Sequence, residues 1–319
     1  MLRALLAAAC AAILAVLVFV DLPSDLIFLE VLQNWGHAPA AGLIALVTLY
    51  LLSGRGAGAG ESHWPRAREY VLAGAIAIAL GIAVEVVQGF IGRDAEVEDA
   101  VQDTLGVVAT LSVHAWLFRA RLALRPGARV TLIAAALIAM IWATAPVAEC
   151  AAAYWHRARL FPVLADFRSP RDLYFIRVVA PPVERQIHPA GVPGLGDEPT
   201  LRVPYGDHPW PGVVIDEPQP DWSAFHNLAV DVSNPNASDL AMLLTVHDRA
   251  YIGGKEDRYD RRFIIPANQR LVLKTSLTDV LHGPRGRVLN LREIGRMAIV
   301  QDSPAPLPAF FLNRVWLEK

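Results

Sequence analysis

Long apolar runs separated by short polar segments fill the first half of the chain. Each of five runs carries few charged residues and is close to the roughly 20 residues that a helix needs to cross a bilayer. The runs cover about 4–20, 36–54, 70–92, 98–118 and 130–149. Because lipid offers the backbone no hydrogen-bond partners, each run is predicted to be a helix. Residues 1–150 are therefore predicted to form a five-helix transmembrane bundle.

The first run also has some features of a secretory signal peptide. A cleaved signal needs a small-residue cleavage site that is followed by a polar start of the mature chain. The segment Val20-Asp21-Leu22-Pro23 offers neither feature. We therefore interpret the run at 4–20 as an uncleaved first span.

From residue 167 onward the pattern changes to short alternating or β-rich runs, which are separated by turns rich in Pro, Gly and Asn. The clearest runs are 173–179, 227–232, 240–247, 270–276, 296–301 and 309–317. Many short strands without intervening helices predict an all-β jelly roll or sandwich over 167–319. Residues 151–166 are predicted to be a short amphipathic continuation of the last span, or a neck. The predicted fold class of the whole chain is α+β and multidomain.

The composition agrees with a membrane part followed by a water-exposed part. Hydrophobic residues make up 54% of the 319 positions and the mean hydropathy is +0.35, which is too apolar for an ordinary soluble protein. Only nine of the 29 Lys and Arg residues fall within 1–150. A net charge of −2 offers no attraction to a polyanion, which argues against nucleic acid as a partner. The two cysteines form neither a disulfide framework nor a metal-binding motif.

The positions of arginine predict which way the spans face. Arg3 precedes the first span, and the segments 54–70 and 119–129 carry three and four arginines. The segment 21–37 has none, and 93–99 has one. Because positively charged loops stay in the cytoplasm, the N-terminus is predicted to be cytoplasmic. An odd number of spans then places the β domain outside the cytoplasm.

A polar hairpin interrupts the apolar pattern between the third and fourth spans. Glu85 and Gln88 share one face of the first helix, and Asp99 and Asp103 share one face of the second. A short connection makes the helices antiparallel neighbours, so the carboxylates are expected at matching depth, with Arg93 within reach. Charged groups in a span usually face the bundle interior and a partner. The group predicts either a site for proton transfer or oxygen-ligand metal binding, or a structural network that locks the hairpin.

Small residues on the same helices predict close packing. Gly81, Gly89, Gly92 and Gly106 are expected to let the helix backbones approach each other. His114 lies on the face of Asp103 but far toward the cytoplasmic end. We interpret it as a packed or interface histidine rather than as part of a site.

The hairpin resembles the signature of the VanZ-like family, which runs approximately Glu-x-x-Gln, Arg, Asp-x-x-x-Asn-x-x-Gly. The residues that match are Glu85, Gln88, Arg93, Asp99 and Gly106. Asp103 stands where the family usually has Asn, which makes the site more acidic. The resemblance covers about 30–120. It implies a multi-pass protein of the bacterial inner (cytoplasmic) membrane with a role in the cell envelope, because the founding member is linked to resistance to the glycopeptide teicoplanin. No settled reaction comes with the family.

The second half resembles a galactose-binding-like jelly roll, the fold of many carbohydrate-binding modules. The segments that carry the resemblance are 166–173 (DFRSPRDL), 221–236 (DWSAFHNLAVDVSNPN), 259–263 (YDRRF), 289–300 (LNLREIGRMAIV) and 309–319 (AFFLNRVWLEK). In relatives the last strand often carries an Asp where this chain has Asn313.

Such modules stack sugars on exposed aromatic rings and bind hydroxyl groups through polar side chains. The residues that we expect to contact a ligand are Trp210, Tyr251, Asp257, Arg258, Tyr259 and Asp260. The alternative is that 255–262 is a solvated loop. Trp222 and Trp316 are predicted to lie in the core.

Several enzyme classes are not supported by the sequence, which has no GxSxG, P-loop, HExxH or dinucleotide-binding motif. The favoured hypothesis is an envelope protein whose outer domain binds a glycan or glycolipid. Its expected partners are an envelope polysaccharide or lipid-linked glycan, and membrane lipid. The alternative is a membrane enzyme that acts on a lipid-linked saccharide or phospholipid by carboxylate acid/base catalysis, and a proton-coupled transporter is the third hypothesis. Whether the protein is an enzyme stays open, and no cofactor and no metal are predicted.

Overall fold

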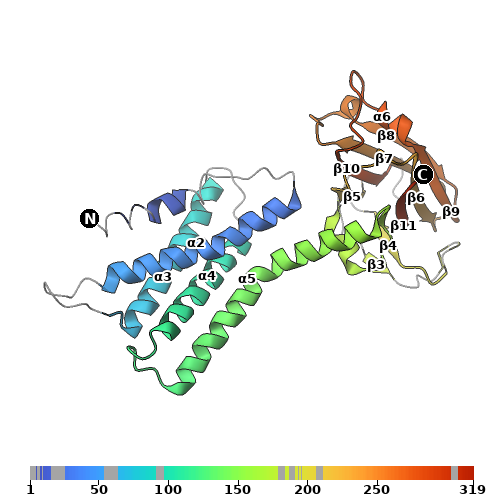
Figure 1. The fold of residues 1–319 in the computed structure, drawn as a ribbon. Coiled ribbons are helices and arrows are strands. Elements are labelled where there is room, and N and C mark those ends of the chain that lie inside the picture. The colour runs from blue at the N-terminus through green and yellow to red at the C-terminus, as the bar shows by residue number, and fades with distance from the viewer. Residues whose placement is uncertain are drawn as a thin grey trace. The chain divides into compact units, whose positions relative to one another are not determined.

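In the computed structural model, the chain divides into two compact units, Met1–Ala151 and Ala152–Lys319 (Figure 1). The residues that the structure describes are 5, 8, 10–15, 26–53, 64–90, 97–178, 184–186, 191–192, 194, 196–205, 211–302 and 308–319. Each unit is described by itself.

The first unit is helical. Its long helices are α2 (Ile27–Ser53), α3 (Ala67–Phe90), α4 (Val97–Leu117) and α5 (Pro126–Leu160), the last of which runs on into the second unit. Among the described residues, α2, α3 and α5 are long and apolar enough to cross a membrane. The helix α4 has 21 residues and is therefore long enough, but Glu98, Asp99 and Asp103 interrupt its apolar run near the start, so α4 is not one of these three helices.

Three of the five predicted spans are thus supported by length and composition. The fourth, 98–118, coincides with α4. Most of the first, 4–20, lies outside the described residues, although residues 10–15 are helical. Of the two alternatives for 151–166, the continuation of the last span describes the first part, because α5 runs without a break to Leu160.

Small side chains hold α2, α3 and α4 together. The core of the helical unit consists of Ala41, Ile44, Ala45, Leu49, Ala73, Ala77, Val107 and Leu111. The closest approach is at Gly106 of α4, where an added Cβ atom would lie 1.8 Å from the carbonyl oxygen of Ala38 in α2. The prediction that Gly106 permits close backbone packing is confirmed.

The second unit consists of two antiparallel sheets. The first sheet has the order β3 (Glu184–Gln186), β4 (Thr200–Pro204), β11 (Ala309–Glu318), β6 (Asn227–Asn234) and β9 (Gln269–Ser276), and β1 (Val163–Ala165) also pairs with β11. The second sheet has the order β2 (Ile176–Val178), β5 (Gly212–Asp216), β10 (Ile294–Gln301), β7 (Leu240–Asp248) and β8 (Tyr259–Ile265). The short helices are η1 (Pro170–Phe175), η2 (Lys255–Asp257) and α6 (Leu277–Leu281). This arrangement agrees with the predicted all-β sandwich.

The inward faces of the two sheets form one large core. Trp222 is fully buried there, and its indole N–H lies 2.9 Å from the carbonyl oxygen of Pro218, so its assignment to the core is confirmed. Trp316, in contrast, is only partly buried. The pairing of β11 with β6 shifts register between Leu312 and Arg314. The shift reverses which alternate residues face inward, so Val315 and Leu317 enter the core and Trp316 faces outward.

The last turns of α5 belong to the β unit and are fixed to it. The guanidinium of Arg157 lies 3.9 Å from the centre of the Phe175 ring and donates a hydrogen bond to the carbonyl oxygen of Glu217. The hydroxyl of Tyr154 donates to the Glu217 carboxylate at 2.7 Å. His156 lies 3.0 Å from Asp172, whose pKa is raised by burial. The helix end is therefore part of the folded β domain.

Replacing Arg157 with alanine is expected to destabilise the β unit by about 2–3 kcal/mol, because the change removes a charged hydrogen bond and a cation–π contact. Arg159→Ala is the matched control, since Arg159 covers only the exposed ring of Trp155. Thermal unfolding of the full chain in detergent, followed by tryptophan fluorescence, measures both. Equal effects of the two variants would contradict the role assigned to Arg157.

Candidate functional site

Charged and polar side chains that are rare in apolar helices meet inside the helical unit. His37 of α2, Glu85 of α3, and Asp99 and Asp103 of α4 are each at most 8% exposed. We call these four residues the polar cluster. The structure therefore brings together three of the predicted hairpin carboxylates. Of the other two predicted members, Gln88 is buried on α3, and Arg93 lies outside the described residues.

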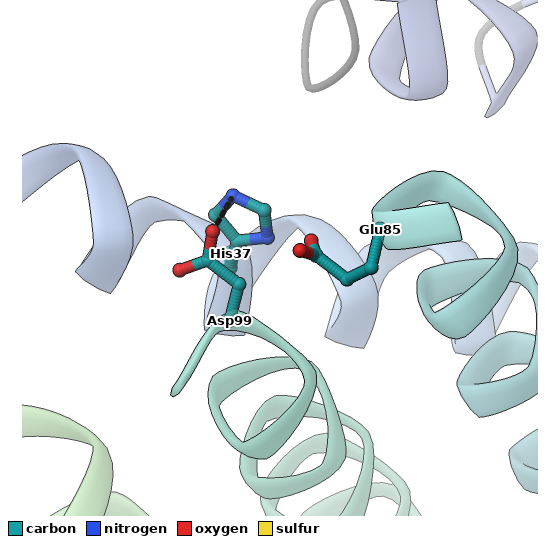
Figure 2. Close-up of side chains that lie close together, drawn as sticks. All are labelled: His37, Glu85 and Asp99. Carbon is teal, nitrogen blue, oxygen red and sulfur yellow. Dashed lines mark ion pairs between the residues drawn. The ribbon is translucent and has the colours of Figure 1, made fainter. Parts of the chain in front are cut away.

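His37 lies between the carboxylates. Its Nε2 atom is 3.5 Å from an Asp99 oxygen, and its Nδ1 atom is 3.4 Å from Oδ1 of Asp103. One nitrogen of His37, one oxygen of Glu85 and one oxygen of Asp99 lie within 4.8 Å of one another. Figure 2 shows the carboxyl groups of Glu85 and Asp99 pointing toward the imidazole from two different helices.

Helix geometry explains this convergence. Asp99 and Asp103 are one turn apart and share a face of α4. Opposite that face, α3 presents Gly81, where an added Cβ atom would lie 2.2 Å from Oδ2 of Asp103. The missing side chain leaves the space that the Asp103 carboxylate fills. The contact of Gly106 with Ala38 holds the neighbouring His37 against α4.

His37 is the member of the polar cluster that was not predicted from the sequence. Its signal was weak, because His37 stood at the edge of the predicted span 36–54, whereas α2 begins ten residues earlier at Ile27 and places His37 well inside the helix, where an ionisable side chain usually marks a site. His114, the other histidine of these helices, is packed as predicted. Its Nδ1 atom is 2.8 Å from the Tyr70 hydroxyl, and its ring lies 4.7 Å from that of Phe118.

Within the described residues, the ligand residues predicted in the β unit pack against or pair with other residues of that unit. Tyr259 is 6% exposed and packs in the core, so its ring has no face open to a sugar. Arg258 is paired with Asp260 at 2.7 Å. The ring of Tyr251 stacks on His247 with 4.2 Å between centroids. Trp210 lies outside the described residues.

Asp257, the remaining predicted ligand residue, belongs to a network of ion pairs around Arg287. Arg287 is hydrogen-bonded to Asp257 and also donates to both oxygens of the buried Asp248, at 2.8 and 2.9 Å. The hydrogen bond from Arg287 and one from the amide of Ile252 lower the pKa of Asp257. Burial alone would raise the pKa of Asp248, but hydrogen bonds from Arg287 and the Asn290 amide outweigh burial and lower it.

A different pocket lies on the outer face of the first sheet and measures about 120 Å³. We call it the sheet pocket. It is lined by Asp166, Arg168, Glu198, Pro199, Asp231, Arg270, Asn313, Arg314 and Trp316. The strands β6, β9 and β11 supply its floor, and the register shift in β11 turns Trp316 toward it.

The floor of the sheet pocket is a connected hydrogen-bond network. Asn313 donates to Asp231 at 3.0 Å and to Ser233 at 2.9 Å, and it accepts from Thr200 at 2.8 Å. Arg270 pairs with Asp231 at 2.6 Å and with Glu198 at 2.7 Å. The bond to Asp231 is the main cause of the raised pKa of Arg270. The polar groups of this pocket are held in place by one another.

No family model matches the sequence, and no curated protein matches it significantly. The VanZ-like assignment of the first part therefore stays a prediction.

Among solved structures, the chain is similar to a family 11 carbohydrate-binding module from Clostridium thermocellum in complex with a β-1,3-1,4-mixed-linked tetrasaccharide. The identity is 13%, the match covers 49% of this chain and 94% of that one, and the TM-score is 0.35. It is also similar to the CBM22-1 xylan-binding domain of Xyn10C from Paenibacillus barcinonensis, at 11% identity, 49% and 95% coverage and a TM-score of 0.33. An exo-β-agarase matches at 18% identity, with 49% and 24% coverage and a TM-score of 0.38. At these TM-scores the similarity supports no inference about ligands, which has to come from the geometry of the sites.

Proposed function

We propose that this chain is an integral membrane protein that binds a glycan or glycolipid through the sheet pocket of its β domain. The observation that carries the proposal is the fixed polar floor of Asp231, Arg270 and Asn313 beside the indole of Trp316. Three apolar helices long enough to cross a membrane support the anchoring role.

The chemistry of the sheet pocket favours a neutral saccharide. Sugars are recognised by an aromatic face that packs on the ring and by polar groups that bind its hydroxyls. Trp316 offers the surface of a partly exposed indole ring, over which the guanidinium of Arg314 lies at 5.1 Å from the ring centre. The network below the ring offers both donors and acceptors. The three carboxylates of the lining are matched by three arginines, so their formal charges cancel. A pocket without excess charge has no preference for a phosphate or a carboxylate ligand.

Replacing Trp316 with alanine is expected to weaken glycan binding by up to about tenfold, since an aromatic stacking contact contributes about 0.5–1.5 kcal/mol and 1.4 kcal/mol is a factor of ten. Binding of the full chain in detergent to mixed-linkage β-glucan and to xylan, measured by affinity electrophoresis, tests this.

Tyr251→Ala is the matched control, because Tyr251 is a partly exposed aromatic residue in the loop after β7 that was also predicted to contact a ligand. If Tyr251→Ala weakens binding and Trp316→Ala does not, the site lies at the loop between β7 and β8. Absence of binding to a broad panel of neutral glycans would contradict the proposal as a whole.

A membrane enzyme is the second candidate function, and the position of His37 favours it. An imidazole between two carboxylates on neighbouring turns is an arrangement that can take up and release a proton. Under this proposal the polar cluster acts on a lipid-linked saccharide or phospholipid. The test compares the envelope phenotype of the wild type with that of His37→Gln and Asp103→Asn. If both variants lose the phenotype while the protein is still present in the membrane, the enzyme proposal is supported. An unchanged phenotype contradicts it.

A further inference from the structure

We infer that the polar cluster binds a divalent transition-metal ion, with His37, Glu85 and Asp99 as ligands. The three residues come from three different helices, α2, α3 and α4. Their ligand atoms lie within 4.8 Å of one another, and all three side chains are buried (Figure 2). The inference does not depend on glycan binding, because it concerns the helical unit alone.

The spacing of the ligand atoms suits such an ion. Ligands at about 2.0–2.2 Å from a metal in tetrahedral geometry are roughly 3.5 Å apart. The distance from His37 to Asp99 is already 3.5 Å. A side-chain rotation of Glu85, whose carboxylate points toward the imidazole, would complete the set.

Asp103 provides a second, independent observation. It is 2% exposed, and its Oδ1 atom makes no hydrogen bond among the described residues although it faces Nδ1 of His37 at 3.4 Å. The nitrogen of a metal-bound histidine that does not bind the ion commonly donates its proton to a carboxylate, which orients the ring. The geometry of His37 allows this, because an aspartate faces each of its two nitrogens.

The ligand types narrow the choice of ion. One imidazole and two carboxylates form a nitrogen and oxygen set, which suits Zn²⁺, Mn²⁺ or Fe²⁺. Ca²⁺ and Mg²⁺ prefer oxygen ligands only, and Cu⁺ prefers sulfur. A bound dication would also offset the cost of placing carboxylates among apolar helices.

The test uses the full chain, purified in detergent without a histidine tag and freed of metal by a chelator. Titration with Co²⁺, a coloured substitute for Zn²⁺, is expected to give a visible absorption band that saturates at one ion per chain, and Zn²⁺ is expected to abolish the band by competition. Metal analysis after dialysis against Zn²⁺ measures the same stoichiometry independently.

Three variants locate the site. His37→Gln and Glu85→Gln are expected to weaken Co²⁺ binding by about a hundredfold, and Asp103→Asn by about tenfold with a shifted band, since it removes only the orienting partner. His114→Gln is the control, because His114 is packed in the same bundle but against Tyr70. Thermal unfolding without metal shows whether each variant is folded.

Two outcomes would overturn the inference. One is a wild-type chain that neither retains Zn²⁺ nor gives a Co²⁺ band. The other is a band that is unchanged in a folded His37→Gln variant or that is lost equally in His114→Gln. Neither outcome bears on glycan binding by the β domain.

Discussion

Arg287→Ala is expected to destabilise the β domain by about 3 kcal/mol. Arg287 donates to both oxygens of Asp248, whose side chain is 1% exposed. Removing one partner of a buried pair leaves an uncompensated charge, which typically costs about 3–5 kcal/mol. The lower end of this range applies because the Asn290 amide still donates to Asp248 at 2.7 Å. Chemical denaturation of the full chain in detergent measures the free energy of unfolding.

Arg285→Ala provides the matched control two residues away. Arg285 pairs with Glu256, but both side chains are exposed, at 83% and 64%. Exposed ion pairs contribute roughly 0–1 kcal/mol, so this variant should unfold almost as the wild type does. If both variants lose the same stability, burial of Asp248 is not the cause.

The effect of Arg287→Ala should also depend on pH. The folded-state pKa of Asp248 is lowered, so its contribution to stability is present above its unfolded pKa of about 4 and is lost as the pH falls through the lower folded value. The stability difference between wild type and Arg287→Ala is therefore expected to shrink below about pH 4. A difference that is constant from neutral pH to about pH 3 would contradict the assignment.

Local spacing predicted the part of the polar cluster that belongs to one hairpin. Asp99 and Asp103 share a helix face by periodicity alone, and the short connection to Glu85 makes α3 and α4 neighbours. His37 comes from a helix about 50 positions earlier, and its place against α4 follows from the fit of Gly106 onto Ala38. No local pattern encodes that contact, so the cluster predicted from the sequence lacked its histidine.

The strand pattern predicted the strands of the β sandwich, but it did not predict which side chains form the pocket on its surface. The runs at 227–232, 240–247 and 309–317 coincide with β6, β7 and β11. Alternation alone placed Trp316 in the core, because it does not reveal the register shift in β11. The sheet pocket was missed since its floor joins strands that are far apart in the sequence.

Gly106→Ala is expected to disrupt the polar cluster from a position outside it. The added Cβ atom would meet the Ala38 carbonyl oxygen at 1.8 Å, so the backbones must separate by roughly 1.5 Å to reach an ordinary contact of about 3.3 Å. Overpacking of this kind costs about 1–3 kcal/mol. Because Ala38 adjoins His37, the same movement withdraws the imidazole from Asp99 and Asp103. The expected result is a lower melting temperature together with Co²⁺ binding weakened by about tenfold or more.

Gly36→Ala separates this effect from a general response to alanine. Gly36 precedes His37 on α2, and an added Cβ atom there has no neighbour within 4 Å. Alanine is the better helix former by about 1 kcal/mol, so this variant should be as stable as the wild type or more stable, with its Co²⁺ band unchanged. If Gly106→Ala keeps the band and the melting temperature of the wild type, the contact of α2 with α4 does not position His37. If it lowers the melting temperature but keeps the band, helix packing and the metal site are independent of each other.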